Sequence, residues 1–409
     1  MKTYLVGGAC RDALLGLRSS DNDYVVVGST EREMLDLGFK KVGAQFPVFL
    51  HPETDEEYAL AREEKKLGNG HNGFIVNFSK ETTIEQDLIR RDLTINSIAY
   101  DSQEDLYIDP YGGIEDIKNR IIRHTSEAFR DDPLRVLRTA RFAAKMHSMG
   151  FKIHLATFYL MQDMVASGEL DYLTPERVWA ETLKALDTKN PEVYFCVLLY
   201  VGALKVIFPE LYALYGVPQP EQHHPEIDTF LHILMCLKRA SESELSLTAK
   251  FAVLAHDLGK GVTPKDMLPK HHGHEEAGVD VINKMCDRLR IPNKYRNIAI
   301  KTSMYHLNIH KIQELNYKTL CNKLISLGAI NNFNQFVEIL QACKCDAQGR
   351  LGLEKVLYPQ YDYAIKCALV LQNIDYRKLA NIYDGDQLLQ QIRKTRYAEL
   401  KKIIEVQKC

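Results

Sequence analysis

Two aspartates near the start of the chain have the spacing of a divalent-cation site. Asp21 and Asp23 lie at the start of the segment DNDYVVVG. Alternate residues of a strand point to the same face, so the two carboxylates should lie side by side. Neighbouring carboxylates repel each other unless a cation lies between them, and Mg²⁺ takes such oxygen ligands together with substrate phosphates. The pair therefore predicts a Mg²⁺ site.

The residues just before this pair could bind phosphate. The segment YLVGGACRD predicts a short strand, a turn at Gly7 and Gly8, and the start of a helix. Backbone N–H groups and the dipole at a helix N-terminus favour phosphate, and Arg11 adds a guanidinium that can donate two hydrogen bonds to it. Together with Asp21 and Asp23, these residues indicate chemistry on a nucleotide.

A second set of polar residues lies on a helix predicted in residues 129–145. Asp132 and Arg135 are three residues apart, which makes them neighbours on one helical face, and Arg138 and Arg141 continue that face at the same interval. Taken alone, this pattern is more typical of a surface ladder of salt bridges beside an apolar stripe.

A third set is rich in histidine. More than half of the fourteen histidines lie between residues 223 and 310, and the pair His256 and Asp257 ends an apolar helix. Neutral imidazoles combined with carboxylates suit transition metals better than Mg²⁺, and a metal-bound water there could attack a phosphate ester. His274 and His306 are further candidate ligands.

Two hydrophobic patterns describe the elements that must position these sets. Short apolar strands dominate up to about residue 110, and apolar residues recur with helical periodicity beyond Ile114. An α/β head followed by a long helical body is the simplest architecture. Residues 63–73, EEKKLGNGHNG, are charged and then glycine-rich, which predicts a mobile loop. Residues 191–211 predict one apolar helix.

Length and composition set the class of protein. The 409 residues are enough for two to four domains, and 45% hydrophobic and 26% charged residues are ordinary for a soluble protein. A net charge of −2 confines any nucleic-acid surface to a local patch. Nine cysteines without a metal-binding spacing favour buried thiols. Because no signal peptide or membrane-spanning run is apparent, we expect a cytoplasmic protein without a membrane partner.

The segments LVGGACRDALLG and DNDYVVVG together resemble the signature of the class II nucleotidyltransferases of the DNA polymerase β superfamily, specifically the bacterial tRNA CCA-adding enzymes. Cys10 stands where this family usually has valine. RRDLTIN resembles the ribose-recognition motif, and DDPLR resembles the ED-x-x-R pair with Asp131 in place of glutamate. AVLAHDLGKG resembles the motif of HD-superfamily phosphohydrolases.

The resemblance implies an α+β fold in which a polymerase-β-like head with a small sheet precedes an all-α body that includes an HD domain. The expected domains are a nucleotidyltransferase head (1–140), a helical neck and body (141–222), an HD phosphohydrolase domain (223–349) and a C-terminal helical tail (350–409). A basic stripe in the tail is a candidate tRNA contact.

The resemblance also implies roles for individual residues in the head. Asp21 and Asp23 are the catalytic Mg²⁺ ligands, and Glu57 is a candidate third carboxylate. Asp132 accepts and Arg135 donates, which fits the Watson–Crick edges of cytosine and adenine and mismatches uracil and guanine. The nucleotide-binding residues for ATP and CTP are Gly8, Arg11, Arg91, Asp92, Asn96, Asp132, Arg135, Arg138 and Arg141.

For the second site, the resemblance implies a transition metal such as Ni²⁺ held by His232, His256, Asp257 and Asp346. The implied activity is addition of C, C and A to tRNA 3′ ends from CTP and ATP. Phosphatase, 2′-nucleotidase and 2′,3′-cyclic phosphodiesterase activities of the HD site would accompany it. The chain could act as a monomer or a homodimer.

Three alternatives remain open. A bacterial poly(A) polymerase shares the head but usually has a basic G-R-R-F segment, which VGAQFPVF lacks. A partial enzyme would add only CC or only A. In a different class, a degenerate nucleotide-binding head would regulate an HD hydrolase, against which the intact Asp21, Asp23, Asp132 and Arg135 count.

Overall fold

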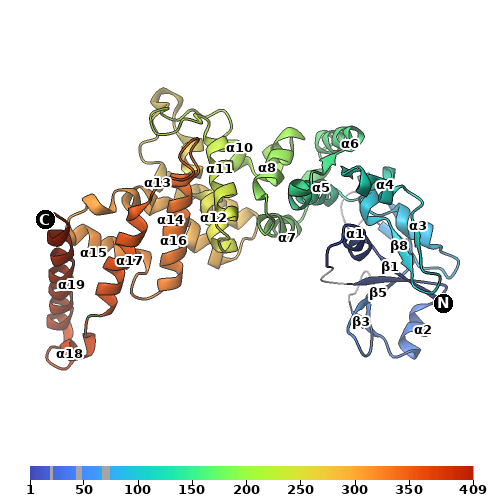
Figure 1. Cartoon of the computed structure of the whole chain (residues 1–409), viewed down its shortest axis with the longest axis horizontal. Helices are drawn as coiled ribbons and strands as arrows, with labels where there is room; N and C mark the ends of the chain where they lie inside the picture. Colours follow the sequence, from blue (N-terminus) through green and yellow to red (C-terminus); the bar gives the residue numbers. More distant parts are fainter. Residues whose placement is uncertain (19–21, 43–47, 67–73, 409) are drawn as a thin grey trace. The chain divides into compact units, whose positions relative to one another are not determined.

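The computed structural model describes residues 1–18, 22–42, 48–66 and 74–408 (Figure 1). None of the helices in these ranges has the length and apolar character that crossing a bilayer requires.

Backbone contacts divide the chain into two compact units. Unit 1 comprises Met1–Ala185 and Val193–Ile207, and unit 2 comprises Leu186–Glu192 and Phe208–Cys409. Unit 1 contains the main sheet, whereas unit 2 is built from helices. An α+β head followed by a helical body is therefore confirmed.

Seven strands of unit 1 form one mixed sheet in the order β3-β4-β5-β2-β1-β8-β9. Strand β1 pairs antiparallel with β2 and β8, and the central strand β2 also pairs in parallel with β5. The strands are β1 (Lys2–Val6), β2 (Asp23–Val27), β3 (Lys40–Val42), β4 (Val48–Leu50), β5 (Glu57–Leu60), β8 (Ala99–Asp101) and β9 (Leu106–Ile108).

Both faces of the sheet are covered at β2, which explains the unbroken apolar run of this strand. Val25 packs in a cluster with Ile84 and Leu88 of helix α3 (Ile84–Ile89), whereas Val26 packs in a second cluster with Met34 of helix α2 (Glu31–Asp36). A strand covered on both faces needs apolar residues at successive positions rather than at alternate ones. The covered sheet fixes the position of Asp23, the first residue of β2.

Two expectations about local structure were wrong. Residues 63–66 form strand β6 (Glu63–Lys66), which pairs antiparallel with β7 (Phe74–Asn77) instead of belonging to a loop, while residues 67–73 lie outside the described ranges. The single helix predicted over residues 191–211 is three helices, α8 (Pro191–Tyr200), α9 (Ala203–Ile207) and α10 (Pro209–Tyr212). Gly202, with a left-handed φ of 83°, separates the first two. A short parallel pair, β10 (Ile121–Ile122) with β11 (Lys152–Ile153), also interrupts the helical body.

Short helices in unit 1 carry the polar residues that the sequence singled out. Gly113, at the start of α4, packs so closely on the backbone carbonyl of Thr94 that a side chain there would clash, which fixes the 3₁₀ turn Thr94–Asn96. The helices of unit 1 are α1 (Gly8–Leu14), α2 (Glu31–Asp36), α3 (Ile84–Ile89), α4 (Gly113–Lys118), α5 (Leu134–Met146), α6 (Leu155–Ala166), α7 (Pro175–Leu186), α8 (Pro191–Tyr200) and α9 (Ala203–Ile207). The last residue of α7 and the first two of α8 are assigned to unit 2.

Unit 2 packs its helices around a core that includes Phe336, Leu340 and both Cys343 and Cys345, so these thiols are packing residues as expected. Its helices are α10 (Pro209–Tyr212), α11 (Thr229–Glu242), α12 (Leu247–Ala255), α13 (His274–Arg288), α14 (Asn293–His310), α15 (Tyr317–Leu327), α16 (Phe333–Gln348), α17 (Pro359–Gln372), α18 (Tyr376–Ala380) and α19 (Gly385–Lys408).

Candidate active sites

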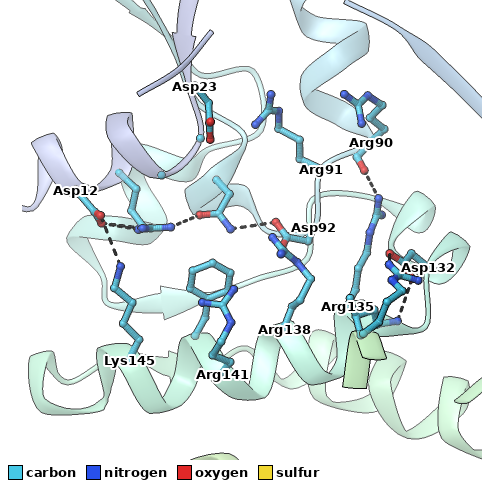
Figure 2. A pocket seen from close by; sticks show the side chains of 17 residues that line it. Asp12, Asp23, Arg90, Arg91, Asp92, Asp132, Arg135, Arg138, Arg141 and Lys145 are labelled. Carbon is cyan, nitrogen blue, oxygen red and sulfur yellow. Dashed lines mark hydrogen bonds and ion pairs between the residues drawn. The ribbon is translucent and has the colours of Figure 1, made fainter. Parts of the chain in front are cut away.

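A cavity of about 580 Å³ in unit 1 brings the predicted nucleotide-binding residues together (Figure 2). All nine of them line it, and so does Asp23. Asp21 lies outside the described residues. The cavity is also lined by Gly7 of the predicted phosphate-binding turn. The other lining residues are ones that we did not predict as functional, namely Asp12, Arg90, Leu134, Phe142, Lys145 and Arg177.

The lining of this cavity is strongly cationic. Eight of its residues are arginine or lysine and four are aspartate. Figure 2 shows Arg138, Arg141 and Lys145 along one side, on α5, and Arg91 with Asp23 on the other. An excess of positive charge in a concave site attracts polyanions, and guanidinium groups match phosphate oxygens. The cavity can therefore hold a triphosphate.

Position 7, at the edge of the cavity, can be occupied only by glycine without strain. Its φ is +68°, and a Cβ atom there would lie 3.0 Å from Nη1 of Arg91. Arg91 is in turn held by the fully buried Asp87, whose Oδ2 is 3.1 Å from its Nη2, and Arg90 contacts the other oxygen at 2.6 Å. Burial alone would raise the pKa of Asp87, but the two arginines hold that pKa below its ordinary value.

Asp92 and Asn96 belong to a chain of hydrogen bonds across the floor of the cavity. Arg11 donates to Oδ1 of Asn96 at 2.5 Å, and the Asn96 amide donates to Oδ1 of Asp92 at 3.0 Å. Arg138 Nη2 is 2.7 Å from Oδ2 of Asp92. Although burial opposes ionisation, Arg138 above all keeps the pKa of Asp92 far below its ordinary value. Both groups are thus preorganised by neighbouring arginines.

Asp132 and Arg135 lie in the same cavity, although not on one helical face as predicted. Helix α5 begins at Leu134, and Asp132 precedes it with an extended backbone. Arg177 Nη2 lies 2.7 Å from Oδ2 of Asp132, and the Leu134 amide donates to Oδ1 at 3.1 Å. The carboxylate is therefore fixed from two directions.

Arg135 is fixed in a comparable way. Its two terminal nitrogens donate to the backbone carbonyls of Ala128 at 2.6 Å and Arg90 at 2.5 Å. In Figure 2 the bond to Arg90 spans the space between α5 and the end of α3. These two carbonyl oxygens fix the guanidinium of Arg135 at the edge of the cavity that it lines.

Sequence reasoning missed several charged residues that form ion pairs with side chains lining the cavity. Lys145 continues the spacing of Arg138 and Arg141 by one further turn, a periodicity that could have revealed it. Its Nζ lies 3.6 Å from Oδ2 of Asp12. Glu181 of α7 accepts from Arg141 Nε at 2.5 Å. Such partners come from distant segments, so their pairing needs the fold.

The candidate third carboxylate, Glu57, is the partner of Asp23 in the register of β2 and β5. Paired residues on neighbouring strands point to the same face of a sheet. The Glu57 side chain is exposed and does not line the cavity. Its role as a ligand stays a prediction.

In unit 2, the four predicted metal ligands meet in the interior. His232 lies on α11, His256 and Asp257 follow α12, and Asp346 lies near the end of α16. Nε2 of His232 is 3.2 Å from Asp346 Oδ1, and Nε2 of His256 is 3.3 Å from Asp257 Oδ2. All four side chains are at most 5% exposed. Asp346, which is far from the other three along the chain, therefore lies beside them in the fold.

The donor set fits a transition metal. Nδ1 of His256 lies 2.8 Å from the Val253 carbonyl and must donate to it, so in the neutral ring, the form that binds a metal, Nε2 carries the lone pair. That Nε2 and the Asp257 Oδ1 are buried without a hydrogen-bond partner in the described part of the chain. His232 points Nε2 inward because its Nδ1 lies 2.9 Å from Glu226. A carboxylate that orients a ligating histidine is a common feature of metal sites.

Cationic side chains balance the buried carboxylates. Lys260 Nζ is 2.6 Å from Asp257 Oδ2, and Arg350 Nη2 is 3.4 Å from Asp346 Oδ1. Burial lowers the pKa of His256, but Asp257 and Asp346 outweigh burial and raise this pKa to about 9. Burial dominates at His306 and lowers its pKa to about 3, so His306 is neutral.

Comparison with known proteins relates both units to described families. A family profile described as "Poly A polymerase head domain" matches residues 3–123. A second, "Probable RNA and SrmB- binding site of polymerase A", matches residues 150–214. A third, "HD domain", matches residues 229–332.

Curated relatives extend the similarity over most of the chain. A multifunctional CCA protein of Mannheimia succiniciproducens is 54% identical over 89% of this chain and 88% of its own length. A protein of the same name from Shewanella denitrificans is 50% identical over 97% of this chain and 96% of its own.

Solved structures show a similar fold. The Thermotoga maritima CCA-adding enzyme in complex with tRNA is matched with a TM-score of 0.64 and 20% identity, over 98% of this chain and 87% of that one. A CCA-adding enzyme in complex with CTP gives a TM-score of 0.62 at 21% identity, over the same shares of the two chains.

Proposed function

Since this chain belongs to the multifunctional CCA protein family, the CCA-adding tRNA nucleotidyltransferases with an HD domain, we propose that its head cavity transfers CMP and AMP to tRNA 3′ ends. The observation that carries this proposal is the convergence of all nine predicted nucleotide-binding residues and Asp23 on one cavity. CTP and ATP are the proposed nucleotides and tRNA the proposed acceptor. The related solved enzymes are named as complexes with tRNA, ATP and CTP.

In the proposed reaction, the tRNA 3′-hydroxyl oxygen forms a bond to the α-phosphorus while the bond to the leaving pyrophosphate breaks. Asp21 and Asp23 would hold Mg²⁺, which lowers the pKa of the hydroxyl and neutralises charge on the triphosphate. Arg138, Arg141 and Lys145 offer cationic groups to the phosphates along one wall. Correct placement of both reactants is the main contribution of the protein to such a transfer.

The protein itself would select the base. Asp132 accepts from the amino group of cytosine or adenine, and Arg135 donates to the adjacent ring nitrogen. Uracil and guanine would turn a carbonyl toward the carboxylate of Asp132. That contact leaves two acceptors facing each other, and an unpaired buried polar group costs about 1–3 kcal/mol. Arg91, Asp92 and Asn96, next to this pair, would bind ribose and phosphate.

Loss of the Mg²⁺ ligands tests the proposal. Asp21→Ala and Asp23→Ala should each abolish incorporation of labelled CTP into tRNA that lacks CCA, with tRNA binding retained. Asp36→Ala, an exposed aspartate on α2, is the matched control and should keep full activity. Incorporation that survives Asp21→Ala would show that the head works by another mechanism.

For the second site, we propose a metal-dependent phosphohydrolase in which His232, His256, Asp257 and Asp346 bind a transition metal such as Ni²⁺. Such an ion activates water for attack on a phosphate ester. The finer proposal is that the substrates are phosphomonoesters, 2′-nucleotides and 2′,3′-cyclic phosphates, as found at damaged RNA ends. Release of inorganic phosphate from phosphomonoesters and opening of a 2′,3′-cyclic nucleotide by the metal-loaded protein test this proposal.

We also propose a cytoplasmic location, where tRNA is available.

A further inference from the structure

Lys145 is held more loosely than the two cavity arginines that precede it on α5. Its Nζ lies 3.6 Å from Oδ2 of Asp12, whereas Arg138 and Arg141 lie 2.7 and 2.5 Å from carboxylate oxygens. Oδ1 of the same Asp12 already accepts from Nε of Arg11 at 2.8 Å. The Lys145 side chain lines the cavity and keeps 41% of its surface exposed. Its ammonium group can therefore turn toward a ligand.

Lys145 lies at the end of the cavity opposite the proposed base-selecting pair. Figure 2 shows Asp132 and Arg135 on one side, Lys145 with Asp12 on the other, and Arg138 between them. An α-helix rises about 1.5 Å per residue, so the step from Arg135 to Lys145 along α5 covers about 15 Å. This length is comparable with that of an extended nucleoside triphosphate. A base bound at Arg135 would therefore place the last phosphates beside Lys145.

The β- and γ-phosphates leave together as pyrophosphate, so Lys145 lies beside the leaving group. When the bond between the α-phosphorus and the bridging oxygen breaks, that oxygen gains negative charge, which a positioned proton donor can neutralise. Among the described residues that line the cavity, Lys145 is the single lysine beside seven arginines. A guanidinium keeps its proton at any pH the protein experiences, whereas a lysine ammonium can give its proton up.

The surroundings of Lys145 make its proton easier to release. Partial burial lowers the pKa of Lys145, and the positive charges of Arg11 on α1 and Arg141 on α5 lower it further, while Asp12 on α1 opposes them. A general acid is most effective when its pKa lies near the working pH. The pKa of Lys145 is thus displaced in the direction that proton donation requires.

We propose that Lys145 is the general acid of nucleotidyl transfer and donates a proton to the leaving pyrophosphate. This inference rests on the proposed function of the head cavity. The tRNA 3′-hydroxyl oxygen loses its proton to water and forms its bond to the α-phosphorus. The bond from the α-phosphorus to the bridging oxygen breaks, and the proton of Nζ moves to that oxygen. Lys145 is left as a neutral amine and takes a proton from water before the next turnover.

Lys145→Arg tests the inference because it keeps the positive charge but cannot donate a proton. In a single turnover with tRNA lacking CCA, incorporation of labelled CTP should slow by about 100-fold or more. The half-saturating concentration of CTP should stay the same. The rate of the unsubstituted protein should fall at alkaline pH, where Lys145 loses its proton, and the variant should lack this fall. Lys118→Arg, an exposed lysine on α4, is the matched control and should keep the full rate.

A CTP analogue with a difluoromethylene group between the β- and γ-phosphorus distinguishes proton donation from a structural role. The fluorines make the leaving group less basic, so its departure depends less on an acid. The ratio of the rate of the unsubstituted protein to that of Lys145→Arg should therefore be smaller with the analogue than with CTP.

Three results would overturn the role of Lys145. They are equal rates for the two proteins with CTP, a loss in Lys145→Arg that appears only as weaker CTP binding, and the same ratio of rates with both nucleotides. In each case CMP incorporation by the unsubstituted protein would leave the proposed function intact. An unsubstituted protein that incorporates no CMP would instead refute the proposed function, and the role of Lys145 with it.

Discussion

At the scale of residues, several of the side chains proposed to bind the nucleotide are held by another charged group. Asp92 holds Arg138, Glu181 holds Arg141, and Arg177 holds Asp132. A charge-assisted hydrogen bond of this kind is about twice as strong as a neutral one and fixes orientation as well. The cavity is therefore preorganised for its ligand, which reduces the entropy lost on binding.

Short motifs revealed the residues that would touch the nucleotide, because their spacing along the chain is local. The residues that hold them could not be found in this way. Arg177 is 45 positions from Asp132, and Glu181 is 40 positions from Arg141. Only the fold brings such pairs together, although the four-residue spacing of Arg177 and Glu181 on α7 does place them on one helical face.

The Arg177 contact predicts a specific loss of nucleotide binding. Arg177→Ala removes a charge-assisted hydrogen bond worth about 1.5–3 kcal/mol and lets Asp132 turn away from the base. We expect kcat/KM for both CTP and ATP to fall by about 10- to 100-fold, measured with tRNA lacking CCA. Arg130→Ala, a half-exposed arginine outside the cavity, is the control. An unchanged kcat/KM in Arg177→Ala would remove this residue from base selection.

Asp87 predicts a pH-dependent contribution to stability. Its pKa is lowered in the folded state, so its ion pairs with Arg90 and Arg91 stabilise unit 1 above the ordinary aspartate pKa of about 4 and are lost as pH falls through the lower, folded value. Asp87→Asn should lower the free energy of unfolding by about 2 kcal/mol at pH 7 and by less at pH 3.

Urea titration followed by fluorescence of Trp179 measures this effect. Trp179 is the single tryptophan of the chain and is buried in unit 1, so its emission reports on that unit. Asp36→Asn, an exposed aspartate, should have no effect at either pH. A loss in Asp87→Asn that is equal at pH 7 and pH 3 would contradict the ion-pair explanation.

At the scale of elements, close backbone approach positions the metal ligands of unit 2. A Cβ atom at Gly259 would clash with the backbone carbonyl of His274, and one at Gly278 would clash with the side chain of Ser303. These glycines let the 3₁₀ turn Leu258–Val262 and helix α14 pack against α13. The strands could be predicted from their apolar runs. The close contacts that Gly259 and Gly278 make between elements could not, because they join segments far apart in the sequence.

Gly259→Ala should therefore separate His274 from Asp257. Overpacking of this kind costs about 1–3 kcal/mol, so the unfolding midpoint of unit 2 should fall and its phosphohydrolase activity should drop sharply. Circular dichroism follows the midpoint, and unchanged Trp179 fluorescence would show that unit 1 is intact. Val262→Ala, an exposed residue of the same turn, serves as the control. A Gly259→Ala protein with normal stability and metal content would refute the proposed packing role.

At the scale of the whole molecule, each of the two units contains one of the two candidate sites. Every described residue that lines the head cavity belongs to unit 1, and every described metal ligand of the second site belongs to unit 2. The change from short strands to helical periodicity was visible in the sequence. The path of the chain between the two units could not be predicted from the sequence. Leu186–Glu192 belongs to unit 2, and the chain then returns to unit 1 for Val193–Ile207.

The two activities should consequently be separable. His256→Asn should lose phosphate release while CCA addition keeps its full rate, and Asp23→Ala should show the reverse. Both activities are measured on each protein, one by release of inorganic phosphate and the other by incorporation of CTP and ATP. A loss of both activities in folded His256→Asn protein would contradict the assignment of one site to each unit.

The most direct measurement of the central claim is sequencing of the tRNA 3′ ends that the protein makes. Purified protein receives tRNA truncated before CCA, with each of the four nucleoside triphosphates singly and then all together. We predict two added C residues with CTP alone, complete CCA in the mixture, and no addition of U or G. Long A tails would identify a poly(A) polymerase, a stop at CC or addition of A alone would identify a partial enzyme, and unextended ends would indicate a regulatory head. Any of these results would contradict the claim that Asp132 and Arg135 select C and A in place of a nucleic-acid template.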